Sequence, residues 1–160
     1  MNRRTQRKSF PWRCSHCRAK EVYAAVVPYT ARVNHDGRIY ELEIPALDVA
    51  QCRACGEFVL DDVADEQISA ALRGHLGLLT PAEIRRALRK LGMQQKTLAA
   101  CLGIAEATLS RWLSGGLIQS RAMDNLLRVY FSIPAVREIL TGPKTMSDVG
   151  SREVRIEQTA

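Results

Sequence analysis

The sequence predicts an α+β protein in which a small zinc-ribbon β domain precedes an all-α, lambda-repressor-like helix-turn-helix domain. Two observations support this fold class. Two close cysteine pairs enclose a stretch rich in β-branched and aromatic residues, and the second half of the chain repeats the apolar spacing of short helices. The expected divisions are a basic extension at 1–13, a zinc-binding domain at 14–73, a hinge at 74–79, the helical domain at 80–140 and a flexible tail at 141–160.

The cysteine pairs read Cys14-Ser-His-Cys17 and Cys52-Arg-Ala-Cys55. Two intervening residues let one short turn aim both sulfur atoms at one point, and two such turns make the tetrahedral four-sulfur site that structural Zn²⁺ prefers. A disulfide framework would suit a small secreted domain, but the N-terminus is charged and lacks an apolar signal segment. A thioredoxin-like redox pair would need only one such motif, beside a βαβ pattern, and this sequence shows no βαβ pattern. Because four thiolates close the metal, we expect no enzyme activity there.

Between the cysteine pairs the sequence is typical of strands. β-branched and aromatic residues fill 22–27 and 29–33, residues 34–37 signal a turn, and polar and apolar residues alternate over 38–43. A third strand is expected at 44–49. Such a small sheet buries little core, so metal binding should supply much of its folding free energy.

An acidic stretch follows the second cysteine pair and predicts a helix over about 62–73, because carboxylates in the first turn favour the helix dipole. Gly74 and Gly77 are expected to end this helix.

The second half of the chain opens with a helix start signal. Thr80, Pro81 and Glu83 stand where an N-cap, a first helical residue and a capping-box acid belong. An apolar stripe at i, i+3, i+4 and i+7 carries this helix to Leu91, before Gly92. Four further short helices are expected, at 94–102, 105–113, 120–131 and 133–140.

The segment 95–115 has the order helix, glycine turn, helix that places a second helix in the DNA major groove. Gly103 allows the turn. Arg111 is suited to read guanine edges, while Gln95 and Lys96 are placed to contact phosphate or a base edge. The candidate DNA-binding residues are Gln95, Lys96, Glu106, Ala107, Thr108, Ser110 and Arg111. A helical bundle without a nucleic-acid role is the alternative.

Charge is unevenly distributed along the chain. Residues 1–20 carry seven lysines and arginines and no acidic residue, residues 21–79 have a net charge of −6, and residues 80–131 have a net charge of +5. This division suggests a protein partner for the first domain and DNA phosphate for the second, although a solvated basic face is the plain alternative. No apolar run is long enough to span a membrane, and a cytoplasmic location is expected.

Residues 80–131 resemble the XRE/Cro-type helix-turn-helix family. The chain from Cys14 to about Leu140 resembles the MqsA-like antitoxins, whose first half is a YgiT-type zinc finger. The resemblance is carried by the two cysteine pairs, by Cys52–Glu57 with the acidic helix after it, and by residues 95–115 with Leu-Ser-Arg-Trp as their core motif.

The resemblance implies a structural zinc ion whose ligands fall on Cys14, Cys17, Cys52 and Cys55. It implies a homodimer through the C-terminal domain, which represses its own promoter at a palindromic operator in double-stranded DNA. Interface candidates are Tyr130, Phe131, Ile133 and Val136. A family arginine that contacts DNA falls on Arg111, whereas a family asparagine that reads bases falls on Ala107, which cannot make that bond.

The resemblance also implies that the first domain binds a partner toxin, often an mRNA interferase. The sequence therefore predicts the antitoxin of a type II toxin–antitoxin pair. A zinc-containing helix-turn-helix regulator without a toxin partner is the alternative.

Overall fold

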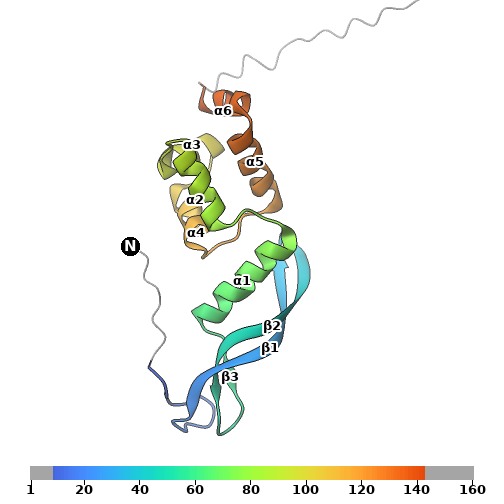
Figure 1. The fold of residues 1–160 in the computed structure, drawn as a ribbon, viewed down its shortest axis with the longest axis vertical. Helices are drawn as coiled ribbons and strands as arrows, with labels where there is room; N and C mark the ends of the chain where they lie inside the picture. The colour runs from blue at the N-terminus through green and yellow to red at the C-terminus, as the bar shows by residue number, and fades with distance from the viewer. Residues whose placement is uncertain (1–8, 143–160) are drawn as a thin grey trace, which may run out of the picture.

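The computed structural model describes residues 9–142, and in them a three-stranded antiparallel sheet is joined to six helices (Figure 1). The strands are β1 (Val22–His35), β2 (Arg38–Cys52) and β3 (Phe58–Val59), in the order β1-β2-β3. The helices are α1 (Asp62–Leu76), α2 (Pro81–Lys90), α3 (Gln95–Leu102), α4 (Glu106–Ser114), α5 (Arg121–Ser132) and α6 (Pro134–Thr141). The predicted α+β class is confirmed. Most of the expected basic extension and nearly all of the expected flexible tail lie outside the described residues.

β1 and β2 form one long hairpin, paired from Val22 opposite Cys52 to the turn. The chain reverses at Asp36 and Gly37, whose φ angles of 51° and 73° are the positive values that a tight two-residue turn needs. The turn predicted at 34–37 is therefore confirmed, and it lies at the end of the hairpin far from the cysteines (Figure 1).

The prolines do not divide the hairpin. Its register shifts between Val27 and Tyr29, so that Pro28 lies opposite two residues of β2, Pro45 and Ala46. Such a bulge accommodates residues that cannot donate to the ladder without ending the strand. The separate third strand predicted at 44–49 is wrong, because these residues continue β2; the third strand is the short β3.

α1 packs against β2 and covers one face of the hairpin (Figure 1). The buried apolar residues between them are Ala31, Leu42, Ile44, Leu47, Val49, Ala64 and Leu72. At the start of the helix, the Asp61 carboxylate accepts hydrogen bonds from the backbone N–H groups of Val63 (3.1 Å) and Ala64 (3.3 Å). The helix therefore has both an N-cap and an apolar face that hold it on the sheet.

α1 ends at Leu76, three residues beyond the predicted end. A glycine inside a helix costs only about 1 kcal/mol relative to alanine. Gly74 therefore stays helical, because burial of the adjacent Leu72 and Arg73 outweighs this cost. Gly77 ends the helix instead, with a φ of 61° and an N–H group bonded to the carbonyl of Arg73.

The helical half has its own core. α2 begins with the predicted capping box: Thr80 Oγ1 accepts from Glu83 N–H at 3.2 Å, and the Glu83 carboxylate accepts from Thr80 N–H at 2.7 Å. The buried side chains shared by α2 to α5 are Ile84, Leu88, Leu98, Ala99, Leu102, Leu109, Trp112, Leu113, Leu127 and Tyr130. None of the helices in the described part of the chain is long and apolar enough to cross a membrane.

A polar junction joins the two halves. The carboxylate of Asp124 in α5 accepts from the backbone N–H of Leu79 at 2.7 Å and from Gln119 Nε2 at 3.0 Å. At the hairpin tip, Asp36 accepts from the backbone N–H of Arg121 at 2.7 Å, in the first turn of α5. The bonds of Asp124 to Leu79 and of Asp36 to Arg121 link segments that are distant in sequence, and a carboxylate at the start of a helix is electrostatically favoured.

Candidate metal centre and nucleic-acid interface

The four predicted zinc ligands meet at one end of the sheet. Their sulfur atoms all lie within 4.8 Å of one another. Cys14 Sγ lies 3.7 Å from Cys55 Sγ, and Cys17 Sγ lies 3.6 Å from Cys52 Sγ. Four sulfur atoms at a Zn–S distance of 2.3 Å in a tetrahedron are about 3.8 Å apart, so the cluster has the size that Zn²⁺ requires.

Each cysteine pair is shaped by the same backbone pattern. In the first turn, Arg18 N–H donates to the carbonyl of Cys14 at 3.0 Å; in the second, Gly56 N–H donates to the carbonyl of Cys52 at 2.9 Å. Arg18 and Gly56 both have positive φ, at 62° and 78°. Glycine adopts this conformation freely, whereas arginine is strained in it. The two turns therefore present their sulfur atoms to one point in the same way.

The thiols are electrostatically coupled. A hydrogen bond from the Cys17 backbone lowers the pKa of Cys14 to about 7. For Cys55 the Glu57 backbone N–H favours the thiolate, but burial and the other three sulfur atoms outweigh it and raise the pKa to about 12. Adjacent thiolates repel one another, and a divalent cation at their centre would remove that repulsion. Because four thiolates leave no open coordination position, the site suits a structural ion.

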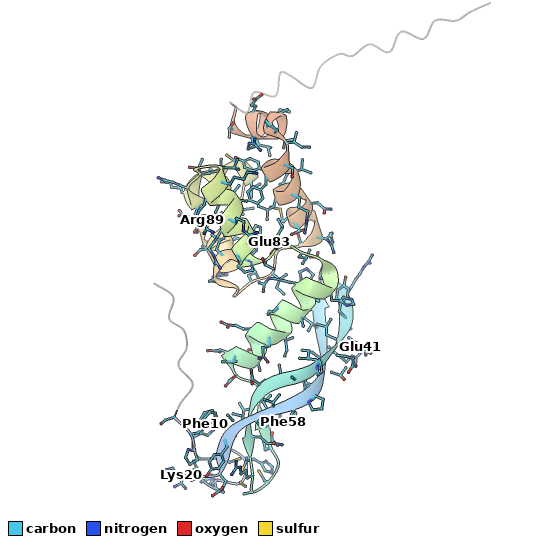
Figure 2. All side chains as sticks on the ribbon, viewed as in Figure 1. Phe10, Lys20, Glu41, Phe58, Glu83 and Arg89 are labelled. Carbon is cyan, nitrogen blue, oxygen red and sulfur yellow. The ribbon has the colours of Figure 1, made fainter. Side chains whose placement is uncertain are left out.

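An apolar layer covers one side of this candidate metal centre, where Cys14 and Cys52 are buried, whereas Cys17 and Cys55 are exposed. Phe10 stacks on Trp12 with ring centroids 4.7 Å apart, and both pack against a small buried cluster that includes Val22 and Ala50. Figure 2 shows Phe10 and Lys20 at this end of the hairpin. Within residues 9–142, no other group of three or more potential ligands gathers closely enough to hold a metal.

The predicted helix-turn-helix is formed by α3 and α4. Gly103 ends α3 with a φ of 69°, and its N–H group bonds back to the α3 carbonyls. Leu98 and Ala99 of α3 are buried, as are Leu109 and Trp112 of α4, so the pair packs through one apolar face. The turn glycine predicted from sequence therefore sets the angle between the two helices.

The structure leaves the candidate DNA-binding residues on the outside of this pair. The exposed ones are Lys96, Glu106, Ala107, Ser110 and Arg111, whereas Gln95 and Thr108 are half-buried. Gln95 Nε2 donates to the backbone carbonyl of Glu106 at 3.4 Å, so the start of α3 touches the start of α4. Their contacts with DNA stay predictions.

Sequence reasoning missed two arginines beside these residues. Arg85 and Arg89, one turn apart on α2, line a hollow of about 380 Å³ together with Gln95, Ser110 and Ser114. Arg85 Nη1 also donates to the carbonyl of Leu113 at the end of α4, and Figure 2 shows Arg89 pointing outward from α2. The net positive charge of this region was the available signal, but charge alone does not identify the helix face that meets α4.

Comparison with known proteins agrees with the helical part of this arrangement. The model of the Helix-turn-helix family matches residues 84–131, the segment that runs from α2 into α5. This match supports a DNA-binding transcription regulator. The resemblance to MqsA-like antitoxins stays a prediction.

The comparison with curated proteins gave no match. Among solved structures, the chain is similar to a protein from Nitrosomonas europaea ATCC 19718 that is provisionally described as DNA-binding. The identity is 13%, the TM-score is 0.39, and the similarity covers 76% of this chain and 95% of the other. A likeness this distant carries no argument about fold or function.

Proposed function

We propose that this chain is a DNA-binding transcriptional autorepressor and the antitoxin of a type II toxin–antitoxin pair. One observation carries the DNA-binding part: α4 packs through Leu109, Trp112 and Leu113 and turns Glu106, Ser110 and other polar side chains outward. A helix held in this way can enter the major groove while its apolar face stays in the core. A cytoplasmic or nucleoid location follows from this proposal.

The proposed DNA contacts are of two kinds, contacts that read base edges and contacts that fix the position of the protein on the phosphate backbone. Arg111 would read a base edge and Thr108 would support it, since arginine pairs with guanine and threonine contacts several bases. Lys96, Arg85 and Arg89 flank α4 on the neighbouring helices and would contact phosphates, which fix the register without reading sequence.

A homodimer is part of the proposal, because repeated half-sites require two recognition helices about 34–36 Å apart. Exposed apolar residues on α5, on α6 and at the joint between them support a second copy there: Val129 is 40% exposed, Ile133 45% and Ile139 75%. No residue of α6 is buried in the single chain. Tyr130 is fully buried in the helical core, so its expected interface role is wrong.

The toxin is proposed to bind the sheet end of the molecule. α1 covers one face of the hairpin, and the opposite face carries Val26 and Ile39, exposed by 61% and 63%. On that face Arg32 and Glu41 pair at 3.2 Å, and Figure 2 shows Glu41 pointing away from α1. Phe58 adds a 41% exposed aromatic ring near the cysteines. Apolar residues rimmed by charge suit a protein partner, and an mRNA interferase is the toxin class that the resemblance implies.

Two experiments test the proposal separately. A gel-shift titration with the duplex upstream of the chain's own gene should show a specific complex that a scrambled duplex does not compete away. Expression of the adjacent reading frame should arrest growth, and co-expression of this chain should restore growth and yield a co-purified complex.

The helix-turn-helix match alone favours a second candidate, a zinc-containing regulator without a toxin. A specific gel shift together with a harmless adjacent reading frame would establish this alternative. Absence of any DNA complex would instead support a helical bundle with another role.

A further inference from the structure

A buried arginine crosses the junction between the two halves of the molecule. Arg73 lies in the last turn of α1, and the residue is only 5% exposed. Its Nη2 atom donates to the carbonyl of Gly115 at 3.2 Å and to the carbonyl of Leu117 at 3.0 Å. These two carbonyls belong to the loop that directly follows α4.

The surroundings of Arg73 make this contact specific. Burial of the guanidinium lowers the pKa of Arg73, and no carboxylate among the described residues pairs with it. Its Nε atom has no hydrogen-bond partner there either. A buried charge without partners is strongly disfavoured, so the two loop carbonyls are what make this position tolerable for arginine.

The same loop is fixed to α4 itself. Gly115 ends the helix with a φ of 89°, and Leu117 N–H bonds to the carbonyl of Arg111 at 3.2 Å. On the other side of the helix end, Arg85 donates to the carbonyl of Leu113. Positive groups at a helix C-terminus are favoured by its exposed carbonyls. The end of α4 is therefore held by one arginine from α2 and, through the loop, by one from α1.

Further contacts connect this loop to the sheet. Ile118 packs against the apolar cluster between the hairpin and α1. A few residues later, Arg121 N–H bonds to Asp36 at the hairpin tip. The segment that follows the candidate recognition helix is thus anchored on the sheet half of the molecule, which sequence reasoning had separated from it by a hinge.

We propose that Arg73 is a positioning residue for DNA binding, which sets the direction of α4 from the metal-binding half of the chain. The inference rests on the proposed DNA-binding function. Its consequence is that loss of the Arg73 bonds tilts or loosens α4 and weakens base reading. Contacts to phosphate tolerate such movement better than base contacts do, because phosphate binding is largely sequence-independent.

The test uses the full chain with zinc and a duplex enriched by the wild-type protein from a random pool. The affinity ratio between this duplex and a scrambled duplex is measured for wild type, Arg73→Met and Arg38→Met, an exposed arginine control on the hairpin. Arg73→Met should lose about tenfold in this ratio, the value of one good base contact. Its affinity for the scrambled duplex and the salt dependence of that affinity should stay at the wild-type level, and Arg38→Met should match wild type.

The outcomes separate the alternatives. A folded Arg73→Met with a wild-type ratio overturns the positioning role, as does a parallel loss on both duplexes, which indicates general destabilisation. If Arg73→Met does not fold, Arg73→Lys is measured instead, because a lysine ammonium group keeps the positive charge but not the planar guanidinium that reaches both carbonyls. Arg73→Lys should lose part of the affinity ratio. An unchanged ratio, or an Arg73→Lys protein that does not fold, also overturns the positioning role. A wild-type protein that enriches no duplex refutes the proposed function itself.

Discussion

Replacement of Asp124 tests how the helical half is held together. The side chain is fully buried and accepts three hydrogen bonds, from Leu79 N–H (2.7 Å), Gln119 Nε2 (3.0 Å) and Arg128 Nε (2.7 Å). Burial alone would raise the pKa of Asp124, but these donors, with the charge of Arg128, hold the pKa below its usual value. The folded protein therefore strongly prefers the carboxylate form.

Asp124→Ala leaves the buried N–H of Leu79 without an acceptor and removes one of the two acceptors of Gln119 Nε2, which keeps its bond to the carbonyl of Leu79 at 2.7 Å. Each such loss costs about 1–3 kcal/mol, while Arg128 adds little because its side chain is 46% exposed and can reach water. The expected decrease in the free energy of unfolding is about 2–6 kcal/mol. Asp124→Asn keeps one oxygen and should lose about 1–3 kcal/mol.

The assay is urea unfolding followed by far-ultraviolet circular dichroism in the presence of zinc, with Asn125→Ala, an exposed neighbour, as control. The control should stay within about 0.5 kcal/mol of wild type. The pKa of Asp124 is depressed in the folded state. The contribution of its carboxylate to the free energy of unfolding is therefore complete above the unfolded pKa of about 3.9 and is lost as pH falls through the folded pKa. The gap between wild type and Asp124→Asn should therefore close in acid. A loss below about 1 kcal/mol for Asp124→Ala would refute the reasoning.

Three other predictions follow from the site. Chelation of zinc should red-shift the emission of Trp12 beside the cysteines and leave buried Trp112 unchanged, as read in single-tryptophan variants, because the cysteine end lies apart from the helical core; a shift of both would show that loss of the metal also unfolds the helical half. Arg18→Gly should raise stability by about 0.5–1 kcal/mol, because glycine relieves the positive φ of 62°, and a lower thermal midpoint would argue against strain. Arg111→Ala should weaken operator binding by roughly 1–3 kcal/mol in a gel-shift titration that Arg38→Ala leaves unchanged; equal titrations would exclude Arg111 as a reader.

Features encoded in neighbouring residues could be predicted from the sequence. The capping box of Thr80 and Glu83 and the glycine turn at Gly103 depend only on local geometry, and both are present. The cysteine spacing likewise specifies two turns, although the meeting of the four sulfur atoms also needs the hairpin to bring Cys52 back beside Val22.

Features that depend on tertiary packing could not be predicted from local pattern. The low helix propensity of Gly74 predicted a helix end there, but burial of its neighbours keeps it inside α1. The predicted boundary between residues 43 and 44 is absent, because β2 continues through Pro45, which a bulge accommodates. Arg73 and Asp36 gave no signal, because their partners lie more than 40 residues away in sequence and no periodicity links them.

The length of the hairpin also sets how far a protein bound to the sheet lies from DNA bound at α4. With 14 residues in β1 and 15 in β2, it spans about 45 Å at 3.3 Å per residue, with the cysteines at one end and α5 at the other (Figure 1). Its tip is docked, so the strands act as a spacer of fixed length. A partner bound at Val26 and Phe58, toward the cysteine end and away from Ile39 at the tip, would lie clear of a duplex at α4, so that the two ligands could occupy one chain together.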